Sequence, residues 1–176
     1  MRYFKKGIDM KIRAVLLLLF LSSVCFATGS RVYDGTNDKF VATTTLGISD
    51  WPISVSMWVW VDDFDANYEV FHIADVSGTA TYFGLGVRSD QRIRMVRRNT
   101  SIVVKHTSAT CSSGEWFHIG MVIAGDADAA VYYNGANKQT DANSVDWSAG
   151  FDTTCVGNEA EASPNAPLDG KTSEIG

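Results

Sequence analysis

The stretch GEWFHIGMVIAGDADAAVYYNG, residues 114–135, decides the fold class of this chain. An apolar run over residues 116–124 is followed by a charged turn at 126–128 and by a second apolar run over 129–133. The stretch ends in Asn-Gly, a dipeptide typical of tight hairpin turns because both residues tolerate positive φ. Two neighbouring antiparallel strands with this punctuation indicate an all-β protein.

Short strand-like runs, not helical patterns, fill the rest of the chain. Clusters of Gly, Asn, Asp and Ser separate these runs, as is typical of turns. About ten short strands in roughly 150 residues predict a sandwich or a barrel. Besides the two above, we expect strands at residues 31–33, 39–42, 53–61, 69–74, 81–88, 92–97, 102–106, 137–140, 152–157 and 168–176.

The run ISVSMWVWV, residues 53–61, alternates strictly. Because successive side chains of a strand point to opposite faces, its Ile, Met and Val residues form one face, which we expect to lie in the core. The other face changes from Ser54 and Ser56 to Trp58 and Trp60. Its aromatic end must therefore be covered or must meet a ligand.

The first 27 residues have the pattern of a signal peptide. Five Lys and Arg residues precede an apolar run over residues 14–26, which is too short to cross a hydrocarbon core of ~30 Å. Small residues at Cys25 and Ala27 predict cleavage after Ala27. We therefore expect a secreted or extracytoplasmic protein with no membrane span after cleavage. A start at Met10, a lipoprotein attached through Cys25 and an uncleaved anchor are the alternatives.

Removal of this segment changes the charge of the chain. The whole chain has 15 Lys and Arg and 20 Asp and Glu residues, of which residues 1–27 carry five and one, so 10 and 19 remain, with a net charge of −9. Such an acidic surface disfavours nucleic acid as a partner. The remaining residues, 28–176, suit a single domain with a sizeable core.

Two cysteines, Cys111 and Cys155, remain once the predicted signal peptide is removed. An even count in an exported chain predicts one disulfide, which would close a loop of about 45 residues and stabilise the fold by roughly 3–4 kcal/mol. Two free buried thiols are the alternative. Neither cysteine has a CxxC neighbour or a nearby His pair, so we do not expect zinc.

Five motifs, in order along the chain, resemble those of the laminin-G-like, concanavalin A-like jelly rolls, and the resemblance covers residues 31–176. The motifs are Asp34-Gly35-x-Asn37-Asp38-x-Phe40, the run at 53–61, GEWFHIG at 114–120, VYYNG at 131–135, and Leu168-Asp169-Gly170-Lys171 with Glu174-Ile175.

The resemblance implies an all-β fold, an antiparallel two-sheet β-sandwich of the jelly-roll type, as one domain over residues 28–176. It also implies that Trp116 and His118 pack within the fold and that His118 is not catalytic. In the family the last motif continues into a final strand. We therefore expect that residues 168–176 form an incomplete strand and that the natural protein continues beyond it.

Catalysis is not expected from the carboxylates of this chain. Glycoside hydrolases of the laminarinase type share the fold and need two carboxylates, about 5–5.5 Å apart in a retaining enzyme. Their usual E-x-D-x-x-E pattern is absent; Glu159-Ala160-Glu161 lacks the third acid. We expect a non-catalytic protein, with a degenerate glycoside hydrolase as one alternative.

Basic residues gather between residues 88 and 105, which carry Arg88, Arg92, Arg94, Arg97, Arg98 and Lys105. Alternation predicts that Arg88, Arg92 and Arg94 share one sheet face, where they could hold the carboxylate or sulfate of an acidic glycan. A solvated outer face is the alternative. Sugar rings also stack on aromatic side chains, for which the candidates are Trp51, Trp60, Tyr68, Trp147 and, nearest the arginines, Tyr82.

Calcium is the one cofactor that the resemblance implies. Laminin-G-like domains often hold a Ca²⁺ ion at the sandwich rim through an Asp in the loop before a core hairpin, and Asp75 occupies a comparable loop. A single Asp offers less charge than a Ca²⁺ site usually gathers.

The sequence therefore predicts a secreted, non-catalytic binding module for carbohydrate or for a glycosylated cell-surface or extracellular protein. A structural or adhesion domain that contacts other proteins is the main alternative.

Overall fold

The computed structural model describes residues 29–43, 52–76, 81–99, 101–145, 151–160 and 165–173, and these contain twelve strands and no helix. The strands are β1 (Arg31–Asp34), β2 (Phe40–Ala42), β3 (Ile53–Val61), β4 (Tyr68–Ala74), β5 (Tyr82–Val87), β6 (Arg92–Arg98), β7 (Ile102–Thr110), β8 (Trp116–Gly125), β9 (Asp128–Tyr133), β10 (Gln139–Asp141), β11 (Thr153–Val156) and β12 (Asp169–Ser173).

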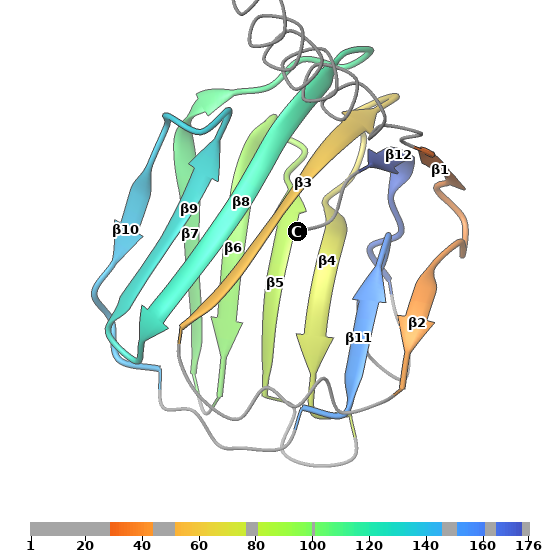
Figure 1. The fold of residues 1–176 in the computed structure, drawn as a ribbon. Coiled ribbons are helices and arrows are strands. Elements are labelled where there is room, and N and C mark those ends of the chain that lie inside the picture. The colour runs from red at the N-terminus through yellow and green to blue at the C-terminus, as the bar shows by residue number, and fades with distance from the viewer. Residues whose placement is uncertain are drawn as a thin grey trace, which may run out of the picture.

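The strands form two antiparallel six-stranded sheets that lie face to face (Figure 1). Sheet A has the order β1-β12-β3-β8-β9-β10, and sheet B has the order β2-β11-β4-β5-β6-β7. Each sheet contains a meander of successive strands, β8 to β10 in sheet A and β4 to β7 in sheet B. The chain ends return to these meanders, because β12 pairs with β1 and β3, and β11 pairs with β2 and β4. The predicted two-sheet sandwich is confirmed.

The turn after β9 has the geometry that the Asn-Gly pair predicts. Asn134 and Gly135 both adopt positive φ, 49° and 68°, and the Ala136 N–H donates to the Tyr133 carbonyl at 3.1 Å. This closes the hairpin between β9 and β10. The expected strand at residues 102–106 is longer than predicted and continues to Thr110 as β7.

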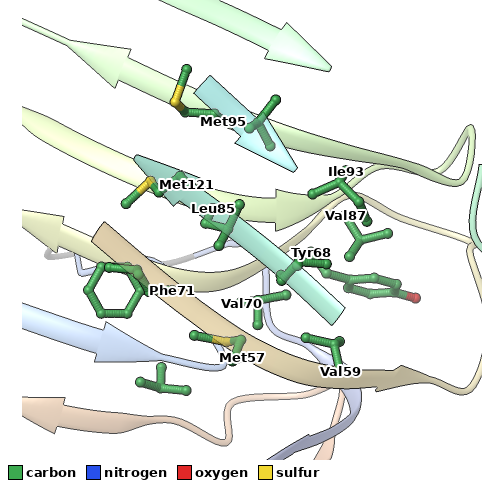
Figure 2. Packing of buried hydrophobic residues seen from close by; sticks show 14 of the residues in the cluster. Met57, Val59, Tyr68, Val70, Phe71, Leu85, Val87, Ile93, Met95 and Met121 are labelled. Carbon is green, nitrogen blue, oxygen red and sulfur yellow. The ribbon is translucent and has the colours of Figure 1, made fainter. Parts of the chain in front are cut away.

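The core lies between the two sheets, and both contribute to it (Figure 2). Met57 and Val59 of β3 and Met121 of β8 face Val70, Leu85 and Met95 of sheet B, and all six are at most 1% exposed. Alternation in β3 is confirmed, since Val55, Met57, Val59 and Val61 are buried and Ile53 packs against the same cluster. Burying each such side chain stabilises the fold by roughly 1.5–3 kcal/mol.

The interpretation of Trp116 and His118 as core residues is wrong. In β8 it is Phe117, Ile119, Met121 and Ile123 that point into the sandwich, whereas Trp116 is 39% exposed and His118 is partly exposed on the outer face of sheet A. Periodicity predicts that the two sets lie on opposite faces but does not say which face a mixed aromatic set occupies.

The predicted disulfide is also wrong, because Cys111 and Cys155 are both free and buried. Cys155 lies in β11, whereas Cys111 follows β7, four strand spacings away in the same sheet. That separation is about 19 Å, far beyond the Cα distance of roughly 7 Å that a disulfide tolerates. The even cysteine count carried no information about strand order.

The predicted signal peptide lies outside the described residues, as do residues 174–176 of the last predicted strand. The described part of that strand, β12, is paired on both sides in sheet A. No helix among the described residues is long and apolar enough to cross a membrane.

Candidate functional site

The predicted basic residues gather on the outer face of sheet B, over β5, β6 and β7. In β6, Ile93 and Met95 are buried in the core, so Arg92 and Arg94 point outward. We call this surface the arginine face and define it by Arg88, Arg92, Arg94, Arg98, Tyr82 and His106. Strand pairing places His106 opposite Arg94 and Tyr82 opposite Arg98.

An ion pair crosses the middle of this face. Glu69 of β4 accepts a hydrogen bond from Arg94 of β6 at 2.5 Å, although β5 lies between the two strands. The carboxylate reaches so far because Gly84 and Gly86 of β5 have no side chains; a Cβ on Gly86 would lie 2.9 Å from Glu69 Oε2 and 2.2 Å from the Tyr68 carbonyl oxygen. The two glycines thus open the channel in which the charges meet.

Arg88 extends the face toward the β5–β6 turn. Its Nη1 donates to His106 Nε2 at 2.6 Å, and its Nε lies 3.2 Å from Asp90 Oδ1. Burial, together with the Arg88 guanidinium, holds the pKa of His106 below its usual value. A neutral imidazole is the form that accepts this hydrogen bond. Arg88 is therefore fixed in place while about a third of its side chain stays exposed.

Tyr82 marks the other end of the face, where a histidine supports it. The rings of Tyr82 and His72 lie 4.7 Å apart, and the Arg98 guanidinium lies 5.6 Å from the Tyr82 ring centre. His72 is 1% exposed, and its Nδ1 accepts a hydrogen bond from the Ala160 N–H. Burial, helped by the charge of Arg94, lowers the pKa of His72 to about 3. His72 is therefore neutral at physiological pH.

Arg97 and Lys105, which belong to the same basic cluster in the sequence, do not join the arginine face. Both lie on the core-facing side of their strands, where Arg97 bonds to Asp141 and Lys105 Nζ lies 3.8 Å from the same carboxylate. Among the aromatic candidates, Tyr68 is buried in the core and Trp60 is half-buried in sheet A. Trp51 and Trp147 lie outside the described residues.

The polar residues that complete the arginine face were not predicted. Glu69, His72 and His106 come from strands that flank the arginine-bearing hairpin. Only strand register connects them to it. A β-bulge between Glu69 and Phe71 shifts that register and places Glu69 and His72 on one face. A charged residue inside the apolar run at 69–74 was the one available signal, since a buried charge needs a partner.

Asp75, the predicted metal ligand, follows β4 at the sandwich rim. Its N–H donates to the Thr81 carbonyl, and the adjacent Val76 N–H donates to Asp152 Oδ1. Asp152 Oδ1 also accepts from Thr153 Oγ1, so part of its bonding capacity is already used. No group of three or more His, Cys, Asp or Glu side chains suited to a metal occurs in the described part of the chain. The described residues alone fit Ca²⁺ poorly.

These contacts give the arginine face the chemistry of an anion site. Guanidinium groups held by fixed partners present planar N–H donors to a carboxylate or sulfate. Glu69 is the carboxylate at its centre, and it is bonded to Arg94.

Comparison with known proteins places this sandwich in a family. Residues 34–175 match the sequence pattern of the concanavalin A-like lectin/glucanases superfamily. The chain belongs to this superfamily. No curated protein matches the sequence.

Solved structures of the superfamily fold resemble the chain at low sequence identity. A heptameric SAP-like pentraxin from Limulus polyphemus is 19% identical, with a TM-score of 0.63 over 83% of this chain and 73% of that one. The LG4-5 domains of the mouse laminin α1 chain are 13% identical, with a TM-score of 0.66 over 84% of this chain and 41% of that one. The CBM40 module of Ruminococcus gnavus IT-sialidase, bound to α2,3-sialyllactose, is 11% identical, with a TM-score of 0.58 over 84% of this chain and 90% of that one. At these identities the similarity establishes the fold.

Proposed function

We propose that this chain is a secreted, non-catalytic binding module that recognises an acidic glycan on the arginine face. The observation that carries the proposal is the gathering of Arg88, Arg92 and Arg94 on one exposed sheet face of a net-acidic protein. Such a face attracts anions locally although the protein as a whole repels them.

The three arginines differ in how far their charge is already neutralised. Arg94 is bound to Glu69 and mostly buried, so it supplies orientation more than free charge. Arg88 shares its charge with exposed Asp90. Arg92 is exposed and forms no ion pair within the described ranges. We therefore expect the ligand anion to bind between Arg88 and Arg92, with Arg94 beside it.

Tyr82 supplies the second element of sugar recognition. The Tyr82 ring, which contacts His72 and the Arg98 guanidinium, offers an edge to the C–H groups of a pyranose. The superfamily fold and the CBM40 module bound to α2,3-sialyllactose, which is an acidic sugar, support the assignment by analogy of fold. The fold is also shared with the LG4-5 domains of the mouse laminin α1 chain, so a structural or adhesion domain stays the alternative.

A binding experiment with charge-matched variants tests the proposal. We expect α2,3-sialyllactose or an oligouronate to bind, and lactose to bind at least tenfold more weakly. The double variant R88A/R92A should lose this binding, whereas R31A/K39A, which removes the same charge in β1 and directly before β2, should keep it. Binding should also weaken as salt rises. Equal binding by both double variants would contradict the proposal, and glycans that never bind would favour adhesion.

We propose separately that Asp75 contributes to a Ca²⁺ site at the sandwich rim. Addition of Ca²⁺ to chelator-treated protein should raise the melting temperature, and the substitution Asp75→Asn should remove that rise. A melting temperature that responds to neither calcium nor chelator would contradict it.

A further inference from the structure

A second surface lies on the outer face of sheet A, on the opposite side of the sandwich from the arginine face. Alternation in β3, β8 and β9 brings five aromatic side chains outward, and we call them the tryptophan face: Trp58, Trp60, Trp116, His118 and Tyr132. Strand pairing sets Trp58 opposite His118 and Trp60 opposite Trp116. Trp58 and Trp116 are 41% and 39% exposed, although large aromatic side chains usually lie inside a fold.

Neighbouring groups hold these rings in fixed orientations. Trp58 meets His118 edge-on at 5.4 Å, and Trp60 meets Trp116 edge-on at 6.0 Å. Trp60 is also capped, because its Nε1 donates to Asp62 and the Lys171 ammonium lies 4.6 Å from its ring centre. Trp58 and Trp116 are thus the two rings open to a ligand. Rings fixed before binding lose little entropy when a ligand arrives.

A shallow groove runs beside these rings. One depression of about 190 Å³ is lined by Ser54, Ser56, His118 and Tyr132 around Gly120. It lies beside a wider hollow lined by Trp58, Trp116 and the turn at Asn134 and Gly135, since His118 and Gly135 line both. A Cβ on Gly120 would lie no closer than 3.4 Å to another atom, so the absence of a side chain there keeps the groove open without a packing need.

Polar groups line the same groove. The Oδ1 atom of Asn134 accepts the backbone N–H of His118 at 2.8 Å, and this exposed side chain also hydrogen-bonds to Tyr133, which uses part of its donor capacity. Ser54 and Ser56 add hydroxyl groups on the opposite wall. Lys138 and Lys171 lie over Tyr132 and Trp60, so these two cations are engaged with rings. The groove therefore offers ring faces, hydroxyls and an amide, and no arginine is among the described residues that line it.

From this geometry we propose that the tryptophan face binds a neutral oligosaccharide, stacked on Trp58 and Trp116 and hydrogen-bonded to Asn134 and the serine hydroxyls. A pyranose has an apolar face that suits an indole ring and a hydroxyl rim that suits these polar groups. The groove is open at the surface, and its apolar area is interrupted by hydroxyls, which suits a sugar chain better than a protein interface with a dry core. The site is separate from the proposed acidic-glycan site and does not depend on it.

The test uses the whole protein and neutral hexasaccharides of β-1,4-glucan, β-1,3-glucan, xylan and mannan, with tryptophan fluorescence and calorimetry as readouts. We expect at least one to bind and to change the tryptophan emission. Trp58→Ala and Trp116→Ala should each weaken binding about tenfold or more. Gly120→Val, which fills the groove and leaves both indoles in place, should weaken it as well. R88A/R92A should bind as the unaltered protein does.

Three results would overturn the proposal. The first is that no neutral hexasaccharide binds. The second is a wrong pattern among the variants: either the folded Trp58→Ala and Gly120→Val proteins still bind the hexasaccharide, or R88A/R92A no longer binds it. The third is concentration-dependent self-association that Trp58→Ala removes, because the tryptophan face would then be occupied by a second copy of the chain.

Discussion

Arg97 of β6 and Asp141 of β10 form an ion pair, 2.5 Å between Nη2 and Oδ2, that joins sheet B to sheet A inside the sandwich. Both side chains are 0% exposed. Arg97 donates further hydrogen bonds to the carbonyls of Asp126, at 2.9 Å, and Asn143, at 2.8 Å. One guanidinium therefore holds the β8–β9 turn, the segment after β10 and an interior strand of the other sheet together.

Removal of the carboxylate should destabilise the protein strongly. We expect Asp141→Ala to lower the free energy of unfolding by about 3–5 kcal/mol, because it leaves the Arg97 charge buried without its partner. Urea unfolding followed by tryptophan fluorescence measures this change. Asp128→Ala, at an exposed position in the adjacent strand, serves as the control and should cost less than about 0.5 kcal/mol. Similar losses in both variants would contradict the role of the pair.

Acid should destabilise the fold through His72. Its pKa is lowered to about 3 in the folded protein by burial and by Arg94, whereas the unfolded chain takes up a proton near its ordinary value of 6.5. The stability that depends on neutral His72 is thus complete above pH 6.5 and is lost as pH falls toward 3, by roughly 1 kcal/mol per unit. Unfolding curves of the unaltered protein and of His72→Gln should converge in acid. Parallel curves between pH 7 and 4 would contradict this expectation.

A methyl group on Gly86 should disrupt the centre of the arginine face. Its Cβ would meet the Tyr68 carbonyl oxygen at 2.2 Å and Glu69 Oε2 at 2.9 Å, so the backbone must shift and the Glu69–Arg94 pair must separate. We expect Gly86→Ala to lower the free energy of unfolding by about 2 kcal/mol or more. Gly125→Ala is the matched control in β8, because its Cβ meets nothing within 4 Å. If the two variants unfold alike, the channel over β5 is not closely packed.

Both cysteines should react as thiols only after unfolding. Burial raises the pKa of Cys111 to about 12 and that of Cys155 to about 11, so neither is a reactive thiolate in the folded protein. In a Cys25→Ser background, we expect two thiols per chain to titrate in denaturant without reductant and almost none in buffer. If no thiol titrates in denaturant, Cys111 and Cys155 form a disulfide and this expectation is wrong.

The strands could be predicted from the sequence because each depends on local alternation and on turn residues. The positions of Met57 and Val59 in the core and of Arg92 and Arg94 on a common face follow from the same period of two. Strand order and the choice between the inner and the outer face of a sheet are not local properties, and the two errors concern these. The even number of cysteines suggested a disulfide, but Cys111 and Cys155 lie four strand spacings apart in one sheet. The apolar residues that flank Trp116 suggested that it is buried, but it lies on the outer face of its sheet.

The same limit applies to the candidate site. Arg88, Arg92, Arg94 and Tyr82 belong to one hairpin, so the sequence brings them together without knowledge of the fold. Glu69 and His72 join them only through the register of β4, which a bulge shifts, and through the two glycines that let Glu69 reach across β5. No pattern in the sequence predicts such a crossing.

Acidic-glycan binding on the arginine face can be observed in a nuclear magnetic resonance titration that follows the arginine Nε–H and tryptophan Nε1–H signals together. On addition of α2,3-sialyllactose, we expect the Arg88, Arg92 and Arg94 signals to shift at concentrations where lactose leaves them unchanged. Shifts of tryptophan signals alone, or equal responses to the acidic and the neutral sugar, would contradict an acidic-glycan site on the arginine face.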